Sequence, residues 1–322
     1  MKGKVTVNAD EIDKKPQPNK RFGIGEIYGQ SFVGISNNER KDLIDLDAKS
    51  RLDCPFLLSF SELAPNKKKN QFQCSKNSGV CSIRNFSESQ NFGPLTATCP
   101  TRFYENGTVF REIGKHLLGD ENAKIAKEIP FLESTVKKKN ATKGPSVGKI
   151  DMVMASTKGG AFTWCAVELQ AVYFSGTKME DDYPAIRKFS GNGVPMPHPK
   201  GRRPDYRSSG PKRLMPQLQT KVPTLRRWGT KLAIVVDRPF FESLSKMKTE
   251  EDISNCDIAW FVVRFDEVEG ENRFELVVDN VVYTTLEESV AGLTAGKPMS
   301  RDSFENNLKK KMGFQDQDSF SF

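Results

Sequence analysis

Short apolar runs of strand length constrain the fold of this 322-residue chain more than any other feature. Residues 231–237, KLAIVVD, have the continuous apolar centre of a strand that is buried on both faces of a sheet. Residues 257–265 and 274–283 have the same character. Two further strand-like runs, 149–156 and 161–174, flank a Thr-Lys-Gly-Gly turn, and this arrangement predicts a β-hairpin.

Helical periodicity is confined to shorter parts of the chain. The spacing of apolar residues predicts a helix over 108–118, and we expect a second short helix over 121–129 that ends at Pro130. Asp302 and Glu305 have the spacing of a capping box and predict a last helix. This mixture of strands and helices indicates the α/β (α+β) class, with a mixed central sheet and flanking helices.

The composition divides the chain into three regions. Residues 1–50 are polar with little periodicity, so we expect an extended N-terminal arm. Residues 51–105 contain four of the six cysteines but few apolar runs, and a module of this kind usually needs a staple such as a metal to fold. Residues 106–322 contain all the strand-like runs and are expected to form the main domain.

Several classes of protein are excluded or disfavoured. No run approaches the ~18 apolar residues that a membrane-spanning helix needs, and the N-terminus lacks the apolar stretch of a signal peptide. We therefore expect a cytoplasmic protein without a membrane partner, in which cysteines are free thiols or metal ligands rather than disulfides. With only two histidines, a three-histidine zinc site is excluded. The chain also lacks the phosphate loop of P-loop ATPases.

The predicted hairpin contains a group of polar residues suited to metal-dependent chemistry. Asp151 lies on its first strand, and Glu168 and Gln170 lie on one face of its second strand. Glu168 is surrounded by apolar residues, where a carboxylate is costly unless it meets a cation or a proton. A divalent metal such as Mg²⁺ would resolve the charge that Asp151 and Glu168 concentrate. The alternative is that both acids are structural and partly exposed at a sheet edge.

The cysteine spacing permits a second metal site. Successive members of the upstream group are separated by 19, 6 and 17 residues, without the CxxC pairs of common zinc ribbons. Four thiolates would suit zinc or iron, and the alternative is four separate buried thiols. The group consists of Cys54, Cys74, Cys81 and Cys99. We interpret the remaining Cys165 and Cys256 as core thiols.

Asp151 followed 17 positions later by Glu168-Leu169-Gln170 resembles the PD-(D/E)xK nuclease signature, with Ile150 in place of its proline and Gln170 in place of its lysine. The words CPFL, GVC and TCP, which contain Cys54, Cys81 and Cys99, precede this motif in fixed order. Together these words resemble the NotI-type restriction endonucleases, in which four cysteines precede a nuclease core whose motif ends in Gln. The resemblance extends from about Cys54 to about Asp237.

The resemblance implies a prokaryotic type II endonuclease that depends on Mg²⁺, acts as a homodimer on a palindromic duplex DNA site and leaves 5′-phosphate ends. It implies that Asp151, Glu168 and the Leu169 carbonyl hold Mg²⁺ and that Gln170 positions the attacking water. Glu133 is a further candidate acid. It also implies a structural iron at the four cysteines, which places iron ahead of zinc. Because a neutral amide cannot stabilise hydroxide by charge, the Gln shifts electrostatic work to the metal or to nearby basic residues.

The segment from Met196 to Lys231 contains ten lysines and arginines and one acidic residue. Such a stripe favours a polyanion partner, although a solvated loop is the alternative. Apolar spacing predicts a helix over 212–228 that turns Arg213, Gln217 and Lys221 away from its apolar face. Arginine can recognise guanine, and glutamine can recognise adenine. The candidate DNA-binding residues are Arg202, Arg203, Arg207, Lys212, Arg213, Gln217, Gln219 and Lys221.

Three functions are consistent with these patterns. The first is a type II restriction endonuclease. The second is a non-catalytic DNA-binding protein that is stapled by a metal and whose carboxylate pair is structural. The third is an RNA-processing or repair nuclease with the same core.

Overall fold

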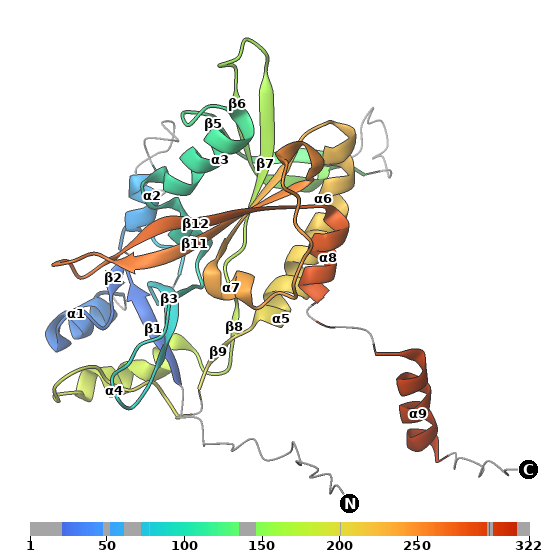
Figure 1. Cartoon of the computed structure of the whole chain (residues 1–322). Coiled ribbons are helices and arrows are strands. Elements are labelled where there is room, and N and C mark those ends of the chain that lie inside the picture. Colours follow the sequence, from blue (N-terminus) through green and yellow to red (C-terminus); the bar gives the residue numbers. More distant parts are fainter. Residues whose placement is uncertain are drawn as a thin grey trace, which may run out of the picture.

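The computed structural model describes residues 21–47, 52–60, 72–76, 78–134, 146–199, 201–294, 296 and 299–313 (Figure 1). The first twenty residues of the expected arm and the C-terminal tail from 314 lie outside these ranges. Within them, no helix has the length and apolar character needed to cross a membrane.

A six-stranded sheet forms the centre of the molecule, in the order β12-β11-β10-β7-β6-β5. β10 is parallel to both of its neighbours, and every other adjacent pair is antiparallel. The expected mixed central sheet is therefore confirmed. Its strands are β5 (Lys124–Glu133), β6 (Ser146–Ser156), β7 (Thr163–Leu169), β10 (Leu232–Asp237), β11 (Ile258–Glu267) and β12 (Phe274–Thr284).

Both faces of this sheet are covered by helices. Consecutive β10 residues belong to different apolar clusters: Ile234 packs with α6 (Met215–Arg227), and Val235 packs with α3 (Thr108–Leu118). Figure 1 shows α3 on one side of the central strands and α6 with α8 (Leu286–Thr294) on the other. Burial on both faces explains why the β10 segment is apolar throughout.

A second sheet lies beside the first, in the order β2-β1-β3-β4. The extended arm expected for residues 1–50 is wrong for residues 21–47, because they form β1, β2 and α1, and the side chains of β1 enter the apolar core. The backbone N–H of Ala97 in β4 donates to Asp237 Oδ2 at the end of β10, at 2.7 Å, and joins the two sheets. The boundaries at 50 and 105 stay predictions. The elements are β1 (Arg21–Ile27), β2 (Gln30–Ser31), α1 (Asn37–Asp47), β3 (Val80–Phe86) and β4 (Thr96–Ala97).

Two local predictions were wrong in instructive ways. Residues 124–133 form edge strand β5 rather than part of a helix over 121–129, and Pro130 is tolerated there because an edge strand can leave one side unpaired. The last helix, α9 (Arg301–Met312), does form, but its N-cap is Ser300, which accepts from the Ser303 N–H. Asp302 therefore lies inside the first turn rather than at the cap.

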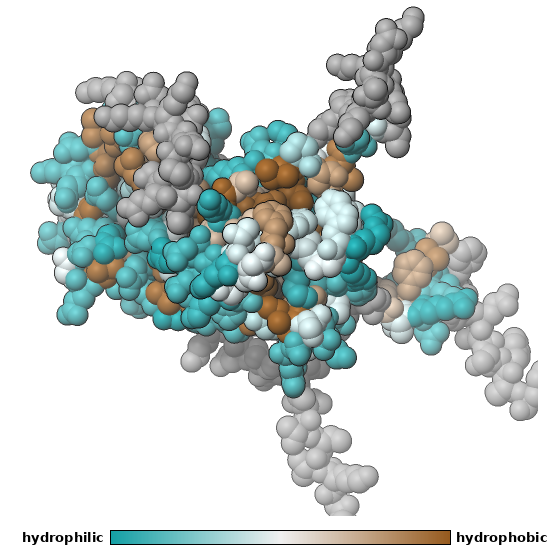
Figure 2. Space-filling view, turned by 90° about the horizontal axis from the view of Figure 1, so that it is seen from above, coloured by the Kyte–Doolittle hydropathy of each residue, from teal (hydrophilic) through white to brown (hydrophobic). Residues whose placement is uncertain are grey.

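The remaining elements are short. They are α2 (Pro55–Ser59), η3 (Pro100–Gly107), β8 (Phe174–Ser175), η4 (Met179–Asp182), α4 (Tyr183–Lys188), β9 (Arg203–Pro204), α5 (Tyr206–Ser209), the π-helix η5 (Gly210–Leu214), α7 (Arg238–Glu242) and η6 (Ile253–Asn255). Two of them, β8 and β9, pair with each other as a separate two-stranded sheet. Seen from above, hydrophilic residues cover most of the surface and hydrophobic ones gather near its middle (Figure 2).

Candidate active site

The C-terminal end of β7 and the middle of β6 bring the predicted acidic residues together. In this antiparallel pair Met152 is opposite Val167, so Asp151 and Glu168 occupy the next positions along the two strands. They line a hollow of about 350 Å³. Its lining residues are Lys76, Thr98, Pro100, Asp151, Glu168, Leu169, Gln170, Ala171, Tyr173, Arg213 and Gln217. Glu133, the further candidate acid, does not line it.

Glu168 is a buried carboxylate with a buried cation beside it. Its residue is 3% exposed, whereas the side chain of Asp151 is 63% exposed. Lys221 Nζ donates to Glu168 Oε2 at 2.6 Å and lies 3.9 Å from Asp151 Oδ1. Burial raises the pKa of Glu168 to about 7, although Lys221 opposes the rise. The sequence required a partner for this carboxylate, and the structure places the ammonium of Lys221 there.

The position of Lys221 corrects the prediction that it faces away from the apolar side of its helix. It is 5% exposed, and its ammonium also donates to Gln217 Oε1, one helical turn earlier, at 2.7 Å. A sequence signal for this existed. Lys221 follows Leu218 by three residues and precedes Leu225 by four, and both leucines are buried, so its spacing is that of a core-facing residue.

Gln170 continues the sheet by one residue beyond β7. Its backbone N–H donates to the Val235 carbonyl at 3.0 Å, and its side-chain Nε2 donates to the Ala171 carbonyl at 2.5 Å. Its amide oxygen is thus the atom that can accept a hydrogen bond from water.

The rim of the hollow is basic and aromatic. The Arg213 guanidinium lies 3.7 Å from the centre of the Tyr173 ring and donates to the Tyr173 hydroxyl at 2.8 Å. Lys76 also lines the hollow. These groups give the entrance a positive charge that suits a phosphate backbone.

The predicted DNA-binding residues divide by exposure. Arg202 is 3% exposed, and its guanidinium donates to the Asp182 carboxylate at 2.5 Å and to the Lys178 carbonyl at 2.5 Å. The donors of Arg202 hold a loop in place, which argues against the prediction that Arg202 contacts DNA. Gln217 is half-buried against Lys221. The exposed members are Arg203, Arg207, Lys212, Arg213 and Gln219.

The four upstream cysteines are all buried and free, and they lie on paired backbone segments. The Cys54 N–H donates to the Phe72 carbonyl, and the Cys74 N–H donates to the Leu52 carbonyl, two residues before Cys54. The Cys99 N–H donates to the Cys81 carbonyl. The hydroxyl of Thr101 lies 2.8 Å from Cys99 Sγ and 3.9 Å from Cys54 Sγ. These contacts bring the two pairs close to each other.

The predicted metal sites are not supported by this arrangement alone. In the ranges that the structure describes, no group of three or more His, Cys, Asp and Glu side chains is arranged to hold a metal ion. Cys165 and Cys256 are buried, as expected for core thiols.

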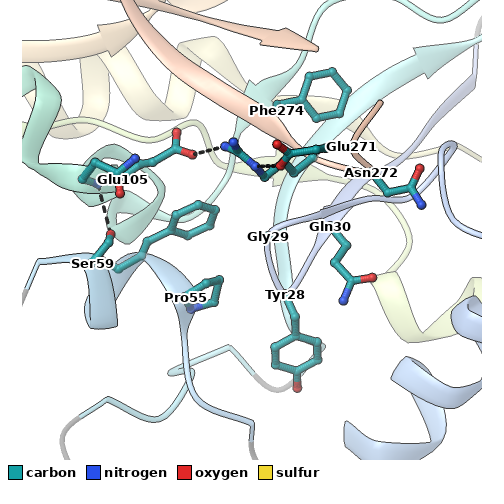
Figure 3. Close-up of a pocket in the computed structure, with 12 residues that line it drawn as sticks. Tyr28, Gly29, Gln30, Pro55, Ser59, Glu105, Glu271, Asn272 and Phe274 are labelled. Atoms are coloured by element: carbon teal, nitrogen blue, oxygen red, sulfur yellow. Dashed lines mark hydrogen bonds and ion pairs between the residues drawn. The ribbon is translucent and has the colours of Figure 1, made fainter. Parts of the chain in front are cut away.

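A larger hollow, of about 550 Å³, lies at α2 and the turn between β11 and β12 (Figure 3). Its buried acid, Glu105, already accepts from Arg102 at 2.7 Å and from the Leu276 N–H at 2.6 Å. Arg273 pairs with Glu271 and also lies 3.9 Å from Glu105 Oε1. Because these charges satisfy one another, we place the candidate site at the smaller hollow.

A family model described as restriction endonuclease NotI matches residues 42–276, which is more than half of the chain. The matched range includes the four cysteines, both acids of the hollow and the whole basic segment. No curated protein is similar enough to count as a match.

Proposed function

The chain belongs to the NotI restriction endonuclease family, and from this premise we propose that the hollow at the end of β7 is the active site of a type II enzyme. As a member of this family the protein is a site-specific deoxyribonuclease that acts on double-stranded DNA. We propose that it depends on Mg²⁺, cuts both strands of a palindromic site and leaves 5′-phosphate ends. The convergence of Asp151, Glu168 and Gln170 on one hollow is the observation that carries the proposal.

The donor atoms of the hollow fit Mg²⁺. Carboxylate and carbonyl oxygens are the ligands that this ion prefers. The two carboxylates already attract a cation, because the ammonium of Lys221 lies near both of them. Asp151, Glu168 and the Leu169 carbonyl would hold the ion. When bound, Mg²⁺ supplies a lowered pKa for water and neutralises charge at the phosphate.

The protein groups then have distinct tasks. The Gln170 amide oxygen orients the attacking water by accepting a hydrogen bond from it. Arg213 and Lys76 at the rim neutralise phosphates next to the cleaved bond. Arg203, Arg207, Lys212 and Gln219 are exposed along the same segment and extend the DNA-binding surface.

Two further parts of the proposal concern assembly. A palindromic site is read most simply by a twofold symmetric pair of chains, so we propose a homodimer. We also propose that the four cysteines hold a structural iron or zinc. Their shared burial and the contacts through Thr101 support this idea. Elemental analysis of the purified protein tests it: about one metal per chain is expected, and a metal-free folded chain would contradict it.

The decisive test of the function is cleavage. Incubation of phage DNA and of a randomised site library with the protein and Mg²⁺ should give discrete fragments with 5′-phosphate ends. A smear would indicate a nuclease without sequence specificity. If both substrates stay intact although the protein binds them, the non-catalytic DNA-binding function replaces the proposal.

A further inference from the structure

We propose that Lys221 supplies the active-site cation that the nuclease motif of this chain lacks at position 170. This inference rests on the proposed function, since it assigns a residue to the same hollow. In sequence Lys221 is 53 residues from Glu168 and belongs to no motif. In the folded chain its ammonium reaches the carboxylate from α6.

The contacts of Lys221 are directed at the site. Its Nζ donates to Glu168 Oε2 at 2.6 Å and to Gln217 Oε1 at 2.7 Å, and Asp151 Oδ1 lies 3.9 Å away. Asp151, Glu168 and Gln217 all line the hollow. The ammonium therefore lies against the wall where the predicted catalytic groups meet.

The location of Lys221 follows from how α6 packs on the sheet. Ala166, two residues before Glu168, belongs to the same apolar cluster as Leu218 and Val222 of α6. Because side chains alternate along a strand, Glu168 points to the same face as Ala166 and meets α6. Lys221, between Leu218 and Val222, is the residue of α6 that reaches it.

Burial argues that the charge itself is required. An ammonium withdrawn from water is costly unless it is paired, and an apolar residue would continue the buried stripe of α6 without that cost. A lysine used only to hold the DNA backbone would be exposed, as Lys212 is. Lys221 is 5% exposed, so contact with a site in the hollow is the use that fits its position.

The chemistry of position 170 explains why a second cation is needed. Gln170 can orient water but has no charge with which to stabilise hydroxide or a phosphorane-like transition state. Glu168 and Gln170 face the same side of the sheet, and Lys221 bonds directly to Glu168. Lys221 is thus a positioning residue for Glu168. It also places one positive charge beside the motif, which has a neutral Gln170 where a lysine is usual. Gln217 holds Lys221 in this orientation.

The first experiment separates this role from DNA binding. In Lys221→Gln, the rate of single-turnover cleavage of prebound DNA should fall by about 10²–10³-fold. The Kd for DNA and its dependence on salt, measured without divalent ions, should not change. The matched control is Lys158→Gln, which removes an exposed lysine from the hairpin turn far along β6 and should leave both quantities unchanged. A raised Kd with a flatter salt dependence would instead make Lys221 a phosphate contact and overturn the proposal.

The second experiment moves the charge. The double variant Lys221→Gln/Gln170→Lys restores lysine to the motif position and should cleave at least about tenfold faster than Lys221→Gln. Failure of this rescue, with both proteins folded by thermal melting, would overturn the proposal and leave Lys221 with a structural role. If Lys221→Gln alone does not fold, cleavage by the folded double variant decides the question in the same way.

The outcomes separate the two proposals. Unchanged cleavage by Lys221→Gln would overturn the role of Lys221 and leave the endonuclease assignment intact. Wild-type protein that binds but never cleaves DNA would overturn the endonuclease, and the role of Lys221 would fall with it.

Discussion

Two clusters of buried charge in this molecule differ in whether they are closed. Beneath the larger hollow, Arg102 uses its guanidinium to contact Glu26 at 2.9 Å, Glu105 at 2.7 Å and the Phe274 carbonyl at 3.2 Å. Glu26 and Arg102 are fully buried. Beside the smaller hollow, Lys221 and Glu168 are also buried, but Asp151 is open to solvent.

This difference shows how buried charged residues that stabilise the fold can be distinguished from those that serve an active site. In the closed cluster every charge is satisfied within the fold, so its value is stability. The open cluster keeps a carboxylate and an amide oxygen facing a cavity, and its buried carboxylate has a pKa of about 7. Perturbed acids that face a cavity are the groups expected at an active site.

The largest effect is expected at the open cluster. Glu168→Ala should lower cleavage by more than about 10³-fold, because one proposed Mg²⁺ ligand and the partner of Lys221 are lost together. Binding of DNA in Ca²⁺, which supports binding without cleavage, should be retained. Cleavage at the wild-type rate would remove Glu168 from the catalytic groups and erase the distinction between the two clusters.

The closed cluster should respond in stability instead. Arg102→Met leaves Glu26 buried without its cation, and we expect a loss of about 3–5 kcal/mol in the free energy of unfolding, measured with urea. Cleavage per folded molecule should be unaffected. The control Lys124→Met, at an exposed position of edge strand β5, should alter stability by less than about 0.5 kcal/mol. A fully stable Arg102→Met with impaired cleavage would reverse the comparison.

Another buried acid, Asp237, tests the effect of burial without a bound cation. Its carboxylate accepts from the Phe240 and Ala97 N–H groups, and burial raises its pKa to about 7. A raised pKa favours the folded state at low pH, and this contribution is lost as the pH rises through about 7. Between pH 5 and pH 8 it should remove about 2–3 kcal/mol of stability.

The matched variant for this prediction is Asp237→Asn, which cannot titrate. The unfolding free energy of the wild type, measured relative to that of the variant, should fall from pH 5 to pH 8. A difference independent of pH would show that Asp237 is ionised at both ends of that range.

The smallest effect concerns the exposed residues of the basic segment. Replacing Arg203 and Arg207 together by Ala should flatten the slope of log K against log salt for DNA binding by up to ~2, if both neutralise phosphates. Arg202→Ala is the informative contrast. Because Arg202 is bound to Asp182, its loss should lower the stability of the protein and leave the salt dependence of DNA binding unchanged. An equal slope in wild type and the double variant would move the DNA-binding surface elsewhere.

Much of the site was predictable because its signals are local. The hairpin with Asp151 and Glu168 was predicted from two strand-like runs and a glycine turn, and the buried face of α6 was predicted from the spacing of its apolar residues. The structure confirms both elements. Residues 21–47 and β5 were mispredicted. β5 has polar, partly exposed faces, and in β1 two glycines and a glutamate interrupt the apolar residues, so neither strand has a strong local signal. Both strands are stabilised by their pairing partners.

The sequence by itself determined most strands of the central sheet, the family and the two acids that line the hollow. Only the tertiary structure decided that Arg202 holds a loop and that Lys221 neutralises Glu168, because each pairing joins residues that are close only after the chain has folded. A lysine on a core-facing position signals that a buried anion must exist, but its identity depends on which strand α6 crosses. The packing of apolar surfaces decides which strand α6 crosses, and the local spacing of charged residues does not predict it.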